Sequence, residues 1–159
     1  MPVTRPVAMG RATHLYEQWL AQRMPLVPRE LRLKHVLMKR DGFSFLRATF
    51  YRWVQVWPTV CPEITTAPVV LAVGDLHLEN FGTWRDQEGR LIWGINDFDE
   101  AYRLPYTNDL IRLAVSAALA SEADQIGLKL KDVCDAILTG YTEGMQSGGG
   151  ISGLRAGAA

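Results

Sequence analysis

Apolar residues recur at helical spacing in the N-terminal part of the chain, which predicts three helices there. The first runs roughly over residues 10–23. Pro25 and Pro28 interrupt the pattern, and Pro28 can open a second helix that continues to about residue 40. The pair Asp41-Gly42 is a turn signal, and a third amphipathic helix is predicted over residues 43–57.

Two short apolar runs predict strands, one over residues 69–73 and one over residues 91–95. Both runs are continuous rather than alternating, which favours burial on both faces. The polar segment 84–90 between them contains Gly89 and predicts a hairpin-like connection. Each predicted strand leads directly into a loop that carries carboxylates.

Two further helices are predicted after the second strand. Thr107 or Asn108 can cap the fourth helix, and Gly127 is placed to end it. The fifth carries an apolar stripe from Leu130 to Tyr141. The Gly, Ala and Ser-rich segment 146–159 has too little apolar surface to offset its ordering entropy and is predicted to be disordered.

Composition limits the class of protein. The 159 residues fit one domain, and 48% hydrophobic with 21% charged residues is ordinary for a soluble globular protein. Lys plus Arg and Asp plus Glu both total 17, so no nucleic-acid partner is expected. No apolar run approaches the ~20 residues that span a bilayer, and the N-terminus has no signal-peptide core. A cytoplasmic protein without a membrane partner is therefore expected.

The two loops carry the residue types of a phosphoryl-transfer site. A phosphoryl acceptor needs a carboxylate to orient its hydroxyl and take its proton, and Asp75 sits directly after a predicted strand and Gly74. Asn80 follows at the D-x-x-x-x-N spacing of the kinase catalytic loop, and its amide oxygen suits Mg²⁺. Asp97 matches the metal-binding Asp of a D-F-G-like segment, and Asp99 is a second possible ligand or a turn residue. Because a loop carboxylate contributes little packing, Asp75→Ala is expected to leave folding nearly intact.

Two other functions fit the same residues. Asp75, Asp97 and Asp99 could join His77 in a divalent-metal site that activates water, as in a metal-dependent hydrolase. Such a site typically needs more histidines, and the remaining ones, at positions 14 and 35, lie on predicted helices. Alternatively, the chain could be a pseudoenzyme or binding module that presents a tryptophan at position 53, 57 or 84 to a partner.

The segment Gly74-Asp75-x-His77-x-x-Asn80 resembles the G-D-x-H-x-x-N loop of aminoglycoside phosphotransferases and choline kinases. Those enzymes usually carry a histidine before the glycine, where this chain has Val73. The resemblance implies that Asp109 braces the catalytic loop from the start of the following helix, and His77 is assigned a bracing role in the same loop. A helix-terminal carboxylate favoured by the macrodipole is the alternative for Asp109.

A more extensive resemblance, over roughly residues 33–145, is to the bacterial family called domain of unknown function 2252. The similar segments lie at residues 42–47, 74–82, 96–101 and 109–116. The resemblance implies a partial protein-kinase-like α+β fold, in which a small β-hairpin carries the catalytic loops among about five helices. It implies Mg²⁺ and ATP as cofactors and transfer to an unidentified small-molecule or protein acceptor.

The predicted organisation has an N-terminal helical segment at residues 1–40, a kinase-like catalytic-loop region at 41–145 and the tail at 146–159. No G-x-G-x-x-G loop and no V-A-I-K-like strand precedes Asp75, and Lys34 and Lys39 lie on a predicted helix. Members of the resembling family are longer, and their further segment would hold the nucleotide phosphates. The expectation is therefore a truncated N-terminal portion with feeble activity or none.

Overall fold

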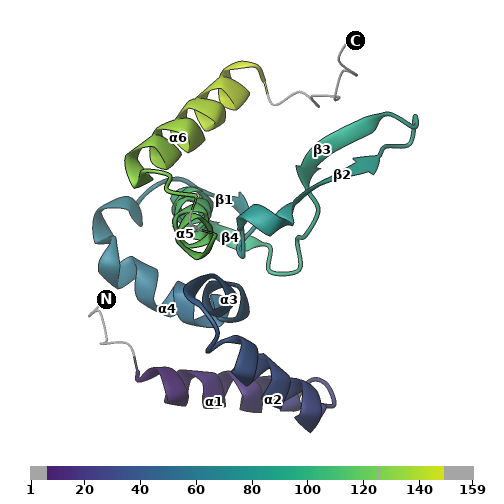
Figure 1. Cartoon of the computed structure of the whole chain (residues 1–159), viewed down its shortest axis with the longest axis vertical. Helices are drawn as coiled ribbons and strands as arrows, with labels where there is room; N and C mark the ends of the chain where they lie inside the picture. Colours follow the sequence, from purple (N-terminus) through teal and green to yellow (C-terminus); the bar gives the residue numbers. More distant parts are fainter. Residues whose placement is uncertain (1–6, 125, 149–159) are drawn as a thin grey trace. The chain divides into compact units, whose positions relative to one another are not determined.

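The computed structural model describes residues 7–124 and 126–148 and has the predicted α+β fold (Figure 1). The chain divides into two compact units, Met1–Pro68 and Val69–Ala159. The division lies in the proline-punctuated segment before the first strand. Among the described residues, no helix is both long and apolar enough to cross a bilayer.

The first unit is helical. Its elements are α1 (Met9–Ala21), α2 (Pro28–Leu37), α3 (Gly42–Ala48), α4 (Phe50–Val60) and the short 3₁₀ helix η1 (Pro62–Ile64). Ala12, Leu46, Phe50 and Trp57 are buried. The rings of Tyr16 and Tyr51 stack with their centroids 4.2 Å apart, which joins α1 to α4.

The helix predicted over residues 43–57 is in fact two helices, α3 and α4, that meet at Thr49. The Thr49 backbone is not helical, with φ −132° and ψ 37°. Its hydroxyl donates a hydrogen bond to the Phe45 carbonyl at 2.7 Å, which gives that carbonyl a side-chain partner. A threonine hydroxyl can compete in this way with the helix's own hydrogen bonds, and the apolar period does not report such a break.

In its described residues, the second unit has four strands in two antiparallel sheets. The strands are β1 (Val69–Ala72), β2 (Phe81–Arg85), β3 (Leu91–Ile95) and β4 (Tyr102–Pro105), with β1 paired to β4 and β2 paired to β3. The predicted strands correspond to β1 and β3, so the two are not partners of each other. The sequence pattern does not predict β4, because this strand is short and contains Arg103 and Pro105.

The pairing register brings two loops side by side. Ala72 at the end of β1 is opposite Tyr102 at the start of β4, and Phe81 at the start of β2 is opposite Ile95 at the end of β3. The loops 73–80 and 96–101 therefore both join the same end of one sheet to the same end of the other. The backbone N–H of Asn96 donates to the carbonyl of Asn80 at 2.9 Å where the two loops meet the second sheet.

The burial expected for both predicted strands on both of their faces is wrong. In β3, Leu91 and Trp93 are exposed on either side of the buried Ile92. The expectation is also wrong for β1. Val69, Val70 and Leu71 are exposed, Leu71 to 77%, and of this strand Ala72 is the buried residue. A continuous apolar run shows that burial would be tolerated at each position, but it does not supply a layer that covers the strand.

In the part of the second unit that is described, the strands are followed by the helices α5 (Thr107–Ala123) and α6 (Leu130–Gln146). The N-cap of α5 is Tyr106 and no side chain caps it, so the capping role expected of Thr107 or Asn108 is wrong. Because α6 continues to Gln146, helix covers the first residue of the predicted tail. The tail beyond residue 148 lies outside the described residues.

Candidate functional site

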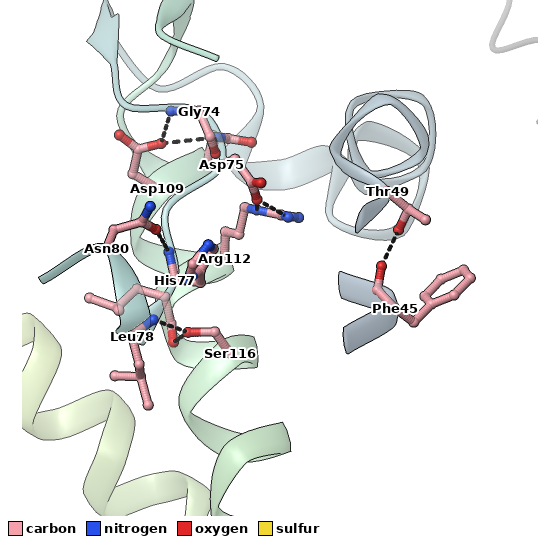
Figure 2. A network of polar contacts seen from close by, with 12 residues as sticks. Phe45, Thr49, Gly74, Asp75, His77, Leu78, Asn80, Asp109, Arg112 and Ser116 are labelled. Atoms are coloured by element: carbon pink, nitrogen blue, oxygen red, sulfur yellow. Dashed lines mark hydrogen bonds and ion pairs between the residues drawn. The ribbon is translucent and has the colours of Figure 1, made fainter. Parts of the chain in front are cut away.

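A row of polar side chains on α5 lies against the loop 73–80 (Figure 2). Asn108, Arg112 and Ser116 are spaced four residues apart, so they lie on one face of the helix. All three are fully buried, with relative exposures of 0%. Buried polar groups are costly unless they have hydrogen-bond partners, and this row finds partners in the loop. We call these three residues together with Asp109 the α5 polar row.

Asp109 holds the backbone just before Asp75. Its carboxylate accepts hydrogen bonds from the N–H groups of Val73 at 2.7 Å and of Gly74 at 3.0 Å. The side-chain amide of Asn108 donates to the Gly74 carbonyl at 3.3 Å and to Asp109 at 3.0 Å. Gly74 has φ +87°, a conformation that residues with a Cβ rarely adopt. The turn that presents Asp75 is therefore fixed by α5 and by this glycine.

The side chain of Asp75 forms an ion pair with Arg112. The Arg112 Nε atom donates to Oδ1 of Asp75 at 2.8 Å, and Nη2 donates to the same oxygen. The Arg112 side chain is 0% exposed and that of Asp75 is 22% exposed. Arginine stays charged at neutral pH, so this is a buried cation whose carboxylate partner reaches the surface.

Burial raises the pKa of Asp75 to about 6, and the charge and hydrogen bonds of Arg112 oppose that rise. The negative charges of Glu100 and Asp97 raise the pKa further. A carboxyl with this pKa is mostly ionised at neutral pH and takes up a proton slightly below it. That range suits a group that must accept a proton during a reaction near neutral pH.

The second half of the same loop is also held by its own side chains and by α5. His77 and Asn80 form a reciprocal capping box across the 3₁₀ helix η2 (Leu78–Asn80), and the Asn80 Oδ1 atom accepts the His77 N–H at 2.6 Å. Both side chains are buried. The Ser116 hydroxyl oxygen accepts the Leu78 N–H at 3.2 Å and donates to the Leu113 carbonyl at 2.8 Å.

The loop 96–101 supplies three exposed carboxylates, from Asp97, Asp99 and Glu100. One oxygen of Asp97 accepts the Asp99 N–H at 3.3 Å, so the two aspartates share a turn. Asp97 and Glu100 are close enough to Asp75 to raise its pKa. Asp97 and Glu100 of the loop 96–101 thus interact electrostatically with Asp75 of the loop 73–80.

The oxygen-bearing side chains of the two loops decide whether a cation could bind there. In the part of the chain that is described, no three His, Cys, Asp or Glu side chains are grouped to hold a metal by themselves. Mg²⁺ is typically bound by one or two carboxylates, waters and substrate phosphates, so it does not need such a cage. The Asn80 amide oxygen accepts one hydrogen bond and has a second lone pair. Of the three predicted metal ligands, Asp97 and Asp99 are exposed, whereas the Asn80 side chain is buried.

From the sequence alone, no role is expected for Arg112, Ser116 or Glu100. The role expected for Asn108, to cap α5, is wrong. A signal for the α5 polar row existed, because three polar residues recur every fourth position in a helix otherwise rich in Leu and Ala. Helical spacing gives the shared face, but it does not say which loop that face contacts. The partners became visible only from the fold.

The residues of the alternative functions are placed as follows. His14 and His35 lie on α1 and α2 in the first unit, and the His35 Nε2 atom is 2.5 Å from a Glu17 carboxylate oxygen. Trp57 is buried, whereas Trp84 is 40% exposed and its ring lies over Gly94 of the neighbouring strand. Trp57 is thus a core residue, and Trp84 packs on its hairpin.

Comparison with known sequences identifies one family. The family described as "Uncharacterized protein conserved in bacteria (DUF2252)" matches residues 23–156. The match includes both loops, the four strands, α5 and α6. No curated protein and no solved structure is significantly similar to the chain.

Proposed function

The chain belongs to the DUF2252 family of bacteria, and on that premise we propose that its second unit is the catalytic-loop part of a kinase-like phosphotransferase. The reaction would transfer the γ-phosphoryl group of ATP, in the presence of Mg²⁺, to a hydroxyl group of the acceptor. The observation that carries the proposal is the nested pairing of the strands, which joins the loops of Asp75 and Asp97 between the same two sheet ends.

Phosphoryl transfer depends mainly on positioning and on electrostatic stabilisation. Positioning and electrostatic stabilisation both require a rigid loop. The loop 73–80 is held at its start by Asp109, in its middle by Arg112 and near its end by Ser116. In this proposal Asp75 orients the acceptor hydroxyl and takes its proton. His77 and Asp109 brace the loop through the contacts described above.

Asn80 and Asp97 would hold Mg²⁺, and Asp99 is a possible further ligand. When bound, the ion would supply positive charge that offsets the negative charge of the transferring phosphoryl group. The loop 96–101 carries three exposed carboxylates, and their mutual repulsion is relieved when a cation binds among them. The same repulsion acts on Asp75, whose pKa Asp97 and Glu100 raise.

A thermal-shift experiment tests the proposal directly. We expect ATP with Mg²⁺ to raise the melting temperature of the protein, because a ligand that binds the folded state stabilises it by mass action. In Asp97→Ala the rise is expected to vanish, because the carboxylate that holds the cation is gone. The matched control is Asp135→Ala, which removes an exposed aspartate on α6 and should keep the shift.

The same experiment separates the other functions. A shift with Mn²⁺ or Zn²⁺ alone, together with turnover of a simple phosphoester, would support a metal-dependent hydrolase instead. No shift with any of these ligands would support a binding module. Loss of the ATP shift in Asp135→Ala as well as in Asp97→Ala would show that the response does not come from the two loops.

A further inference from the structure

The two carboxylate oxygens of Asp75 have different contacts in its ion pair with Arg112. Both hydrogen bonds that Asp75 receives from Arg112 end on Oδ1. Within residues 7–124 and 126–148 no hydrogen bond reaches Oδ2, although the Asp75 side chain remains 22% exposed. One oxygen is therefore held from the protein side, and the other is available to a ligand.

We propose that Arg112 is a positioning residue for the phosphoryl transfer described above, and that it holds Asp75 by Oδ1 so that Oδ2 receives the acceptor hydroxyl. This inference rests on the proposed function and adds a residue and an atom to it. A guanidinium is a planar group with donors in fixed directions, so rotation of the Asp75 carboxylate would break both hydrogen bonds.

Arg112 itself has little freedom to move. Its side chain is completely buried, and it projects from α5 between two other contacts of the α5 polar row with the same loop. Asp109 binds the backbone before Asp75, and Ser116 binds the backbone after it. Since a single helix fixes both the loop backbone and the Asp75 side chain, the direction of Oδ2 is set by α5 (Figure 2).

Arg112 also sets the charge of Asp75. The charged groups that act on Asp75 are Arg112 from α5 and the carboxylates of Asp97 and Glu100 from the loop 96–101. Glu100 and Asp109 act in turn on Arg112. Burial and the two carboxylates favour the protonated form of Asp75, whereas Arg112 favours the ionised form. Arg112 thus keeps Asp75 able to accept a proton at neutral pH.

The transfer can be followed without a known acceptor by using water in its place. The oxygen of water forms a bond to the γ-phosphorus of ATP as the bond to the bridging β–γ oxygen breaks, which yields ADP and inorganic phosphate. The proton of the attacking water passes to Oδ2 of Asp75 and then to solvent. The rate of ADP release therefore depends on the fraction of Asp75 that is ionised.

The experiment measures two quantities in the wild type, Arg112→Lys, Arg112→Met and the control Arg103→Met. One is the pH midpoint of the Asp75 carboxyl carbon by NMR, with the signal assigned by its absence in Asp75→Asn. The other is the pH dependence of ADP release from ATP with Mg²⁺. Arg103 is an exposed arginine on β4, so its removal tests the loss of one positive charge alone.

In Arg112→Met we expect the NMR midpoint and the acidic limb of the rate profile to rise together by about 1–3 pH units, the effect of losing a contacting opposite charge. The plateau rate should fall by about 10-fold to 100-fold because the carboxylate is no longer oriented. In Arg112→Lys the pH midpoint should return most of the way to its wild-type value, because an ammonium group supplies the positive charge. The plateau rate should stay low, because an ammonium group lacks the planar arrangement of donors of a guanidinium. Arg103→Met should match the wild type.

The possible failures are distinguishable. An unchanged Asp75 midpoint in Arg112→Met, with wild-type transfer present, overturns the role of Arg112 and leaves the proposed function standing. If the wild-type protein binds no ATP and releases no ADP, the proposed function is overturned. The role of Arg112 is then overturned as well, at any pH midpoint of Asp75. If circular dichroism shows Arg112→Met unfolded, Arg112→Lys decides: a plateau rate equal to that of the wild type overturns the inference.

Discussion

Asp75→Ala is expected to lower the free energy of unfolding of the second unit by about 3–5 kcal/mol, the usual cost of removing one partner of a buried ion pair. The reason is the 0% exposure of Arg112. Without Asp75 the guanidinium is a buried cation that has lost a carboxylate and two hydrogen bonds. The sequence alone suggests that this substitution is nearly neutral, and the ion pair reverses that expectation.

The accompanying variants separate charge from hydrogen bonding. Asp75→Asn keeps a side-chain oxygen for Arg112 and should lose much less stability than Asp75→Ala. This follows from the raised pKa of Asp75, which shows that burial penalises its ionised form more than Arg112 stabilises it. The double variant Asp75→Ala, Arg112→Met also removes the buried cation that has lost its carboxylate, and it should recover much of the lost stability.

Urea denaturation followed by circular dichroism measures these free energies. The double-mutant cycle gives the coupling between the two side chains. Equal unfolding free energies for Asp75→Ala and the wild type, with no coupling in the cycle, would contradict the ion pair as the organising contact of the loop.

The second large effect is kinetic, and it should appear in Asp75→Asn because this variant keeps its fold. An amide cannot take the proton of the attacking hydroxyl, so the rate of ADP release from ATP with Mg²⁺ should fall by about 10²–10⁴-fold. Binding of ATP with Mg²⁺ should persist, since Asn80 and Asp97 are unchanged. Steady-state kinetics should therefore show a loss in kcat with KM nearly constant.

Asp97→Ala is the matched comparison for this kinetic test. It removes a proposed cation ligand, so its loss should appear in binding, and the thermal shift described above reports it. A loss of binding in Asp75→Asn, or normal turnover in that variant, would contradict the assignment of Asp75 as the proton acceptor.

Much of the local structure follows from the sequence. The apolar runs of β1 and β3 and the helical periods of α1, α2, α5 and α6 appear where the pattern predicts them. These elements are detectable because their periodicity is local. The break at Thr49 is not detectable from periodicity, because the Thr49 hydroxyl that donates to the Phe45 carbonyl lies inside a continuous apolar stripe.

The candidate site could be predicted in part. Asp75, Asn80 and Asp97 stand out because polar residues follow apolar runs at a characteristic spacing. The pairing of β1 with β4 and of β2 with β3 could not be derived, because strands this short pair by tertiary context rather than by pattern. The role of Arg112 depends on that pairing, since the loop it contacts is placed by the two sheets.

Paramagnetic Mn²⁺ offers the most direct test of whether the two loops share one cation, because it broadens the NMR signals of nuclei close to it. Titration of the protein with Mn²⁺, with and without ATP, should broaden the backbone amide signals of residues 73–80 and 96–101 together at the lowest concentrations. Asp97→Ala should abolish that broadening in both loops, and Asp135→Ala should not change it. Broadening of only one loop, or equal broadening at exposed carboxylates throughout the protein, would contradict a shared site.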